Sequence, residues 1–273
     1  MLAVTPLKRT VISILMLLVT VIFTFPLIWL ILTSFKFRID IFAIPPTIFT
    51  YTLENYAFVF GSPWMRNFYN SIIVAVISMI FSLVVGTLTA YGFSKYPIRR
   101  SENVLFWILS LRMLPVIAIL VPFYIVFKTV KLLDTYLALI MIYSIFNIAF
   151  TIWLMKDMFD QVPKEIEEAA MLDGYKPWEI FLEISLPQVY AGLATTAIFC
   201  LIQTFNEFFI ALILTNQVAL TAPVGLMSKF SSFFGIEWGQ ITAAATVFLA
   251  PIIVFTVFVR NYLVQGLSFG QMK

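Results

Sequence analysis

The chain has 273 residues and a formal net charge of +3 at pH 7, and 62% of its residues are hydrophobic while only 11% are charged. Soluble domains have about 45–50% apolar and about 25% charged residues, so most of this chain requires lipid as its solvent. The same figures exclude disorder, nucleic-acid binding and a secreted disulfide scaffold, which need polarity, clustered basic charge or several cysteines. Because the sequence has no histidine and a single cysteine, a zinc site and a His-dependent triad are excluded, and we expect no metal site.

Hydrophobic stretches long enough to cross a bilayer follow one another along the whole chain. The third stretch is apolar apart from Arg112, and we expect Pro115 and Pro122 to kink it. The predicted spans are residues 10–35, 67–94, 103–127, 135–155, 188–214 and 241–263. The predicted fold class is therefore an all-α membrane protein, with six transmembrane helices in a single domain over residues 1–273.

The distribution of Lys and Arg over the short loops predicts the orientation of these spans. Six spans place both termini on the same side of the membrane. The termini and the loops on that side carry more Lys and Arg than the other three loops together. Because basic residues favour the cytoplasmic side, we expect both termini in the cytoplasm.

The loop 156–187 is the most polar part of the chain, with three lysines and eight carboxylates. A proline before residues 164–173 and a glycine after them predict a short helix over 163–173. Pro177 is suited to begin a second amphipathic helix, and we expect Pro187 to end it. The loop therefore predicts a helix, a glycine turn and a second helix outside the bilayer.

The predicted helix over 163–173 carries an apolar face, with Ile166, Ala169 and Ala170 at helical spacing. Glutamates flank this face at Glu165, Glu167 and Glu168. An exposed apolar face usually marks a docking surface, and small side chains let another surface approach closely. The plainer alternative is a solvated connector whose charges keep it out of the bilayer.

Glu168-Ala169-Ala170, followed by Gly174 and by Ile184-x-Leu186-Pro187, resembles the EAA signature of permease subunits of binding-protein-dependent ABC importers. The resemblance covers most of the chain and is to the carbohydrate branch of that family. Further matching segments are Arg112-Met113-Leu114-Pro115, Val121-Pro122-Phe123-Tyr124, Asn206-Glu207-Phe208, Pro223-Val224-Gly225-Leu226 and Trp238-Gly239. It implies the type I ABC importer permease fold in a bacterial or archaeal cytoplasmic (inner) membrane, with both termini inside.

The same resemblance implies a transport subunit rather than an enzyme. In such importers the EAA helix docks on a cytoplasmic ATPase subunit, whose closure opens a central cavity alternately to each side of the membrane. The coupling residues that it implies here are Glu168, Ala169, Ala170, Asp173, Gly174, Ile184, Leu186 and Pro187. Residues 264–268 resemble the start of the family's C-terminal tail, which reaches the ATPase subunits, whereas residues 269–273 depart from it.

The implied partners are a second permease subunit, two ABC ATPase subunits, an extracytoplasmic solute-binding protein and a carbohydrate substrate. The substrate class is a sugar, an oligosaccharide or a polyol. We expect no cofactor on this chain, because it contains no P-loop of the form GxxxxGK[ST]. ATP and Mg²⁺ belong to the ATPase subunits in this interpretation.

Polar residues inside the predicted spans are candidates either for the substrate pathway or for a structural role. They are Arg112, Asn147, Thr151, Gln203, Asn206 and Glu207. The two ionisable residues among them are expensive in lipid, so each marks a pathway, pairs with the other, or orients a broken helix. The uncharged residues can bond sugar hydroxyls, but such residues more commonly bond between helices. We therefore favour a structural role for this set.

Two other classes of protein compete with the importer. A self-sufficient ion-coupled carrier or channel fits less well, because the spans contain one acidic residue and the best-defined motif lies outside them. An intramembrane enzyme lacks histidine and paired intramembrane carboxylates to carry its chemistry. Dependence of uptake on ATP rather than on an ion gradient separates the importer from the carrier.

Overall fold

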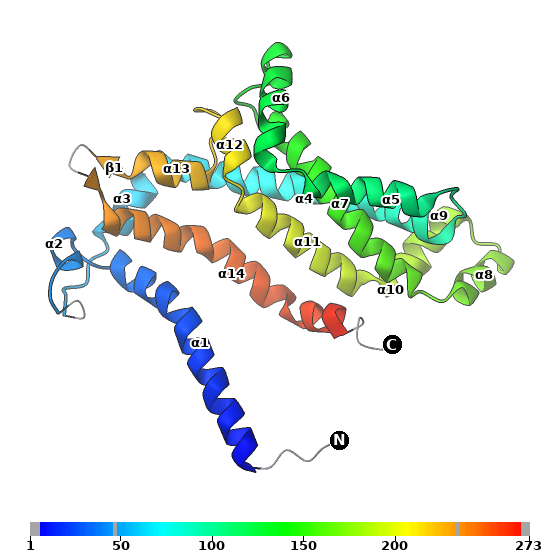
Figure 1. The fold of residues 1–273 in the computed structure, drawn as a ribbon, viewed down its shortest axis with the longest axis horizontal. Coiled ribbons are helices and arrows are strands. Elements are labelled where there is room, and N and C mark those ends of the chain that lie inside the picture. The colour runs from blue at the N-terminus through cyan, green and yellow to red at the C-terminus, as the bar shows by residue number, and fades with distance from the viewer. Residues whose placement is uncertain (1–5, 46–47, 233–234, 269–273) are drawn as a thin grey trace. The chain divides into compact units, whose positions relative to one another are not determined.

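The computed structural model describes residues 6–45, 48–232 and 235–268, and the regular secondary structure of these residues is almost entirely helical (Figure 1). The exception is a short antiparallel ribbon of β1 (Ser231–Ser232) and β2 (Gly235–Ile236). The chain divides into two compact units, residues 1–65 with 226–250 and residues 66–225 with 251–273. The departure from the family tail expected at residues 269–273 lies outside the described residues.

Four helices contain segments long and apolar enough to cross a membrane, and they are α1 (Pro6–Ser34), α4 (Trp64–Lys95), α7 (Tyr136–Asp160) and α14 (Trp238–Ser268). Two bent pairs are each counted as one further span. The first joins α5 (Ser101–Ser110) and the 3₁₀ turn η1 (Leu111–Met113) to α6 (Val116–Thr129). The second joins α9 (Pro177–Glu179), the π-helix η2 (Ile180–Ser185) and α10 (Leu186–Gln188) to α11 (Tyr190–Phe205). The described residues therefore offer up to six membrane crossings.

The shorter helices are α2 (Arg38–Ile41), α3 (Glu54–Gly61), α8 (Lys164–Leu172), α12 (Phe209–Leu214) and α13 (Ala222–Lys229). Of these, α12 lies in the expected span 188–214, which is interrupted between Phe205 and Phe209. The fifth predicted span thus consists of helical pieces rather than one continuous helix.

The bend in the third span lies at Pro115. The α5 and α6 segments meet there at 91°, because Pro115 has no N–H to continue the helix and holds Leu114 in an extended conformation. Pro122 lies inside α6. The expected kink is therefore a sharp break at the first of the two prolines.

In the first unit, Asn55 of α3 holds the chain that follows α1. Its amide nitrogen donates to the carbonyl oxygens of Ser34 and Lys36, each at 2.9 Å. Gly239 of α14 faces the same amide so closely that a Cβ there would lie 2.8 Å from it. Glycine is needed at this position because another residue's side chain would displace the amide.

In the second unit, α7 is the central helix and packs against α5, η1, α11 and α12. Half of its apolar stretch is buried inside the protein. Helix α4 also approaches α7 closely, since a Cβ on Gly86 would lie 2.6 Å from the side chain of Thr151. Small residues at such contacts let helix backbones come together in lipid, where burial of apolar surface does not drive association.

Asp134, in the turn before α7, anchors the segment that follows α12. Its carboxylate accepts hydrogen bonds from the backbone N–H groups of Asn216, Gln217, Val218 and Ala219 at 3.0–3.2 Å. Burial acts to raise the pKa of Asp134, but these four donors together outweigh it and hold the pKa below its ordinary value. The carboxylate is therefore a fixed acceptor for this segment at neutral pH.

Candidate functional site

Helix α8 confirms the short helix predicted over residues 163–173. It spans Lys164–Leu172, with Pro163 at its N-cap. Beyond its end, Gly174 has φ of +90°, and its N–H donates to the carbonyl oxygen of Met171 at 3.2 Å. The N–H of Tyr175 donates to the carbonyl oxygen of Ala170 at 3.1 Å, which completes a Schellman motif. This turn fixes the direction in which the chain leaves α8.

The two faces of α8 differ from the expectation in one respect. Ala170 is buried together with Glu167, three residues before it, so these two form the inward face. Ile166 and Ala169 lie on the exposed face with Leu172, which is 89% exposed. Ile166, Ala169 and Ala170 lie within one sector of the helix, as predicted from their spacing, but this sector is not exposed throughout, because Ala170 is at its buried edge beside Glu167.

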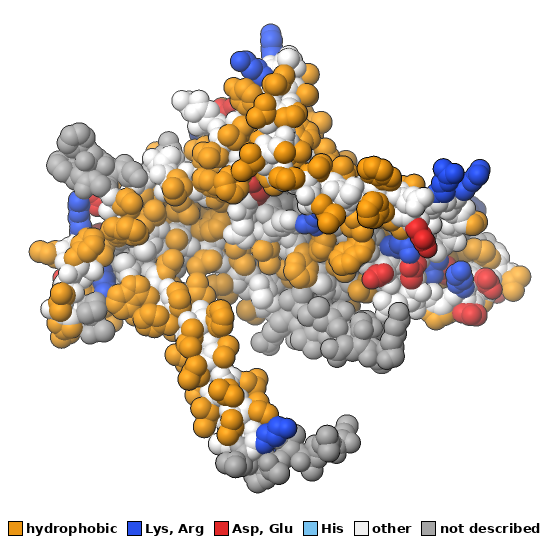
Figure 2. All heavy atoms as spheres, viewed as in Figure 1, with side chains coloured by type: hydrophobic (Ala, Val, Ile, Leu, Met, Phe, Trp, Pro, Cys, Tyr) orange, Lys and Arg blue, Asp and Glu red, His pale blue; other side chains and the backbone are white. Residues whose placement is uncertain are grey.

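Charged side chains gather at the α8 and α9 end of the second unit, whereas hydrophobic side chains cover most of the visible surface of α6 (Figure 2). Such a charged region cannot lie in hydrocarbon without a large cost. The charge on and around α8 therefore favours a position for this helix outside the hydrocarbon.

The second helix of the loop begins at Pro177, as predicted. The N–H of Lys176 donates to the carboxylate of Glu179 at 2.8 Å and so stabilises this start. The prediction that Pro187 ends the helix is wrong. Pro187 lies within α10, in the first turn of an α-helical segment where the missing N–H is tolerated, and the chain bends by 79° at Val189.

The coupling residues implied by the EAA resemblance differ in exposure. Glu168, Ala169, Asp173, Gly174 and Pro187 are exposed, Ile184 and Leu186 are half-buried, and Ala170 is buried. Leu186 packs on the apolar cluster at the ends of α4 and α7. The exposed members therefore lie mainly on α8 and its turn, while Leu186 packs on the membrane helices.

A cavity of about 140 Å³ in the second unit is lined by four of the six polar residues singled out from the sequence. These four are Arg112, Asn147, Gln203 and Glu207. Thr151 and Asn206 are outside its wall and bond to backbone carbonyl oxygens on their own helices. The cavity lies at the broken ends of α5–η1 and α11.

The two ionisable residues of the cavity are held by different partners rather than by each other. Arg112 donates to the side-chain oxygen of Gln203 at 2.7 Å, and its guanidinium lies 4.7 Å from the ring centre of Phe150. Glu207 accepts from the hydroxyl of Tyr143 at 2.7 Å and from the N–H of Ile210 at 2.9 Å. Glu207 therefore satisfies free N–H groups at the start of α12.

Two of the uncharged residues, Asn147 and Thr151, contact a neighbouring helix. The amide of Asn147 donates to the hydroxyl of Thr204 at 2.8 Å, which joins α7 to α11. The hydroxyl of Thr151 lies 3.6 Å from the sulfur of Cys200, between the same two helices. These contacts are of the kind that more commonly occupies polar residues within membrane helices.

Sequence reasoning missed Lys95, Ser185, Tyr143 and Asp134. Lys95 directly follows the predicted span 67–94, where a charged residue needs no partner in the chain, yet its side chain is buried with that of Glu167. The spacing of Glu167 and Ala170, which places them on one helical face, was the available signal for an inward acidic residue. The partners of Tyr143 and Asp134 lie more than 60 residues away in the chain, so no local pattern could have indicated them.

The fold is that of an ABC transporter membrane subunit. The chain matches a solved chain of a bacterial ABC transporter involved in the import of the acidic polysaccharide alginate, with a TM-score of 0.78 and 20% identity. The match covers 94% of this chain and 96% of that one. At 20% sequence identity, this structural similarity establishes the fold alone.

Sequence comparison gives the family. Residues 82–269 match the family described as binding-protein-dependent transport system inner membrane component. The chain is 37% identical over 254 residues to the probable ABC transporter permease protein y4oR of Sinorhizobium fredii, covering 92% of this chain and 91% of that protein. It is 31% identical over 272 residues to the trehalose/maltose transport system permease protein MalG of Thermococcus litoralis, covering 98% of each.

The chain therefore belongs to the family of binding-protein-dependent transport system inner membrane components. It is a multi-pass membrane permease subunit rather than an enzyme.

Proposed function

We propose that this chain is the permease subunit of an ATP-driven importer for a sugar, an oligosaccharide or a polyol. Its membership of a binding-protein-dependent family supports an external solute-binding protein as partner. The relative named for trehalose and maltose transport, which matches over nearly the whole chain, supports the carbohydrate class.

The observation that carries the proposal is the exposed face of α8. Ile166 and Leu172 are apolar and face outward beside the small Ala169, while the Gly174 turn fixes the angle between α8 and the next helix. A rigid helix with an apolar outer face is suited to dock in a cleft of another protein and to transmit its movement. This surface is the docking site for an ATPase subunit, with Glu168 and Asp173 at its polar edge.

The remaining parts of the importer follow from this assignment. The chain has no P-loop, so ATP and Mg²⁺ are bound by two separate ABC ATPase subunits, and a second permease subunit completes the pathway. The loop 156–187 and both termini lie in the cytoplasm, where the ATPase subunits are. The half-buried Ile184 and Leu186, next to Pro187, pass the movement of α8 to the fifth span.

The polar residues around the cavity serve chiefly to hold the broken helices together. Arg112 is already bonded to Gln203, Asn147 to Thr204 and Glu207 to Tyr143. Their side chains therefore have less capacity left for a sugar than unbonded polar residues would have. The second permease supplies most of the substrate contacts in this account.

Uptake by membrane vesicles separates the importer from the ion-coupled carrier. Right-side-out vesicles containing the complex are given the solute-binding protein loaded with radiolabelled sugar, with or without internal ATP. The importer predicts uptake that needs hydrolysable ATP and persists when ionophores collapse the proton and sodium gradients. Uptake without ATP that ionophores abolish would contradict the proposal and favour the carrier.

A further inference from the structure

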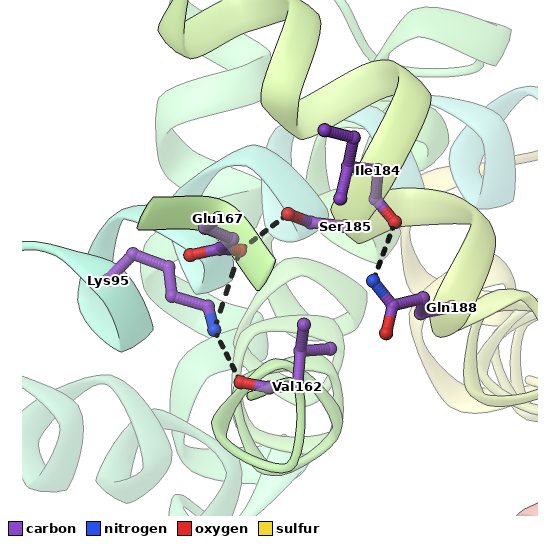
Figure 3. Close-up of polar contacts among 6 residues, drawn as sticks. All are labelled: Lys95, Val162, Glu167, Ile184, Ser185 and Gln188. Atoms are coloured by element: carbon purple, nitrogen blue, oxygen red, sulfur yellow. Dashed lines mark hydrogen bonds and ion pairs between the residues drawn. The ribbon is translucent and has the colours of Figure 1, made fainter. Parts of the chain in front are cut away.

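A buried polar cluster joins α8 to the membrane helices of its own chain (Figure 3). The ammonium of Lys95 lies 3.4 Å from Oε1 of Glu167, and the two side chains are only 7% and 6% exposed. The hydroxyl of Ser185 donates to the same carboxylate oxygen at 2.5 Å. Lys95 also donates to the carbonyl oxygen of Val162 at 2.9 Å. The carboxylate of Glu167 and the ammonium of Lys95 thus link four segments of the chain.

These four residues come from separate elements. Lys95 is the last residue of α4, and Val162 lies in the turn between α7 and α8. Glu167 is on the inward face of α8, and Ser185 ends η2, which leads through α10 into α11. The cluster therefore connects α8 to the ends of α4 and α7 and to the start of the fifth span.

An apolar cluster borders the ion pair. Tyr91 of α4 packs against the rings of Phe159 and Phe181, at centroid distances of 5.3 and 4.9 Å. Met155, Val162 and Val189 belong to the same cluster. Because removing charges from water is costly, this pair is stable only while its two members and their hydrogen-bond partners stay together. Loss of either charge leaves the other buried and uncompensated.

The position of the pair on α8 is opposite to the surface assigned to the ATPase. The outer face carries Ala169 and Leu172, whereas Glu167 faces the spans beside Ala170. A push on the outer face therefore reaches the spans through the inner face. Of the inner side chains, Glu167 makes a charged contact and Ala170 offers only a methyl group.

We propose that Glu167 is a positioning residue that fastens α8 to the end of α4 through Lys95, so that the two elements move as one body during transport. Ser185 holds the same carboxylate from the start of the fifth span. This inference rests on the proposed role of α8 in ATP coupling and adds the second span to the elements that receive its movement.

The first test compares Glu167→Gln with Glu102→Gln, which removes an exposed carboxylate from α5, outside the loop 156–187 and its proposed docking surface. The complete importer is purified with its ATPase subunits and reconstituted in liposomes, and the sugar molecules transported per ATP hydrolysed are measured. We expect Glu167→Gln to lower this ratio about tenfold with the ATPase subunits still bound, within the usual range of coupling between sites. Glu102→Gln should match the unchanged protein. An unchanged ratio in Glu167→Gln would overturn the inference.

The second test removes both charges together, so that neither stays buried alone. In Lys95→Cys/Glu167→Cys, made with Cys200→Ser, a reversible bis-methanethiosulfonate reagent links α4 to α8. Before linking, we expect the number of sugar molecules transported per ATP to be about tenfold lower than in the unchanged protein. The ratio should recover when the two cysteines are linked and fall again when the link is reduced. The inference would be overturned if the unlinked double-cysteine protein transported as much sugar per ATP as the unchanged protein. It would also be overturned if linking did not raise this ratio.

ATP-driven sugar uptake by the unchanged protein tests the proposed function separately from the ion pair. If that protein takes up no sugar with ATP, the role of α8 itself fails. If it transports normally while the two tests give the contrary results, only the fastening of α8 to α4 fails.

Discussion

Charged residues in the helical units of this chain are bound by partners of different kinds. Arg112 lies on a ring and donates to an amide, Glu207 accepts from a hydroxyl and from helix N–H groups, and Lys95 pairs with a carboxylate. Sequence alone predicts that such residues are costly and therefore bonded. It does not predict the partners, because Gln203 is 91 residues from Arg112 and Tyr143 is 64 residues from Glu207 in the chain, and only the folded helices bring each pair together.

The role of Glu207 is testable by truncation. Glu207→Ala removes the acceptor for Tyr143, which is buried, and for the first N–H groups of α12. Leaving such donors unsatisfied costs about 1–3 kcal/mol, so the thermal midpoint in detergent should fall while the KM for sugar uptake stays unchanged. Glu102→Ala, at an exposed position on α5, is the control. A raised KM with unaltered stability would instead indicate a substrate contact.

Asp134 gives a prediction for stability and its pH dependence. Asp134→Asn replaces a carboxylate that accepts four backbone N–H bonds by an amide with a single acceptor oxygen, which should cost about 1–3 kcal/mol at pH 7. Because the folded pKa of Asp134 is lowered, its stabilisation is complete above the ordinary Asp pKa of about 3.9 and is lost as the pH falls through the lower folded value.

Thermal unfolding of the two proteins in detergent between neutral and acid pH measures this difference. Asp157→Asn, at an exposed position near the end of α7, serves as the control and should leave the midpoint unchanged. A difference between Asp134→Asn and the unchanged protein that grows on acidification would show that the carboxylate does not act as this acceptor.

At the scale of the element, the loop 156–187 shows what local signals can and cannot predict. The start of α9 at Pro177 and the turn at Gly174 follow from residues next to them in sequence, and both are confirmed. The inward side of the loop packs on the neighbouring ends of α4 and α7, where Phe181 and Leu186 join the apolar cluster. Those ends are distant in sequence, so the helix faces could not be assigned from the loop alone.

The Gly174 turn is testable by adding a side chain. Gly174→Asp has free space for its Cβ, but a φ of +90° is strained for any L residue, at a cost of about 1–2 kcal/mol. We expect the angle between α8 and α9 to change, so that transport is lost while membrane insertion and expression are kept. Gly92→Ala, at a helical position in α4 that also has free space, should retain transport. Normal uptake by well-expressed Gly174→Asp would contradict the coupling role of the turn.

At the scale of the whole molecule, hydropathy predicts the membrane class and the approximate spans, because uncharged apolar runs have few alternatives to lipid. It does not predict that the third and fifth spans are broken. The break at Pro115 has a local cause, whereas the one near Glu207 combines a helix end with side-chain bonds from α7. Broken helices are tolerated in a membrane protein where other groups satisfy the freed N–H and carbonyl groups, as Glu207 does for Ile210.

The central claim is that the outer face of α8 contacts a separate ATPase, and site-specific photocross-linking tests it most directly. A photoreactive phenylalanine analogue is placed at Leu172 on that face and, as a control, at the exposed Ile125 of α6, and the captured proteins are identified by mass spectrometry. The account predicts an ABC ATPase subunit cross-linked from Leu172 in native membranes and not from Ile125. If ATP-driven uptake is intact in the membranes but the analogue at Leu172 captures no ATPase subunit, the result would contradict this claim.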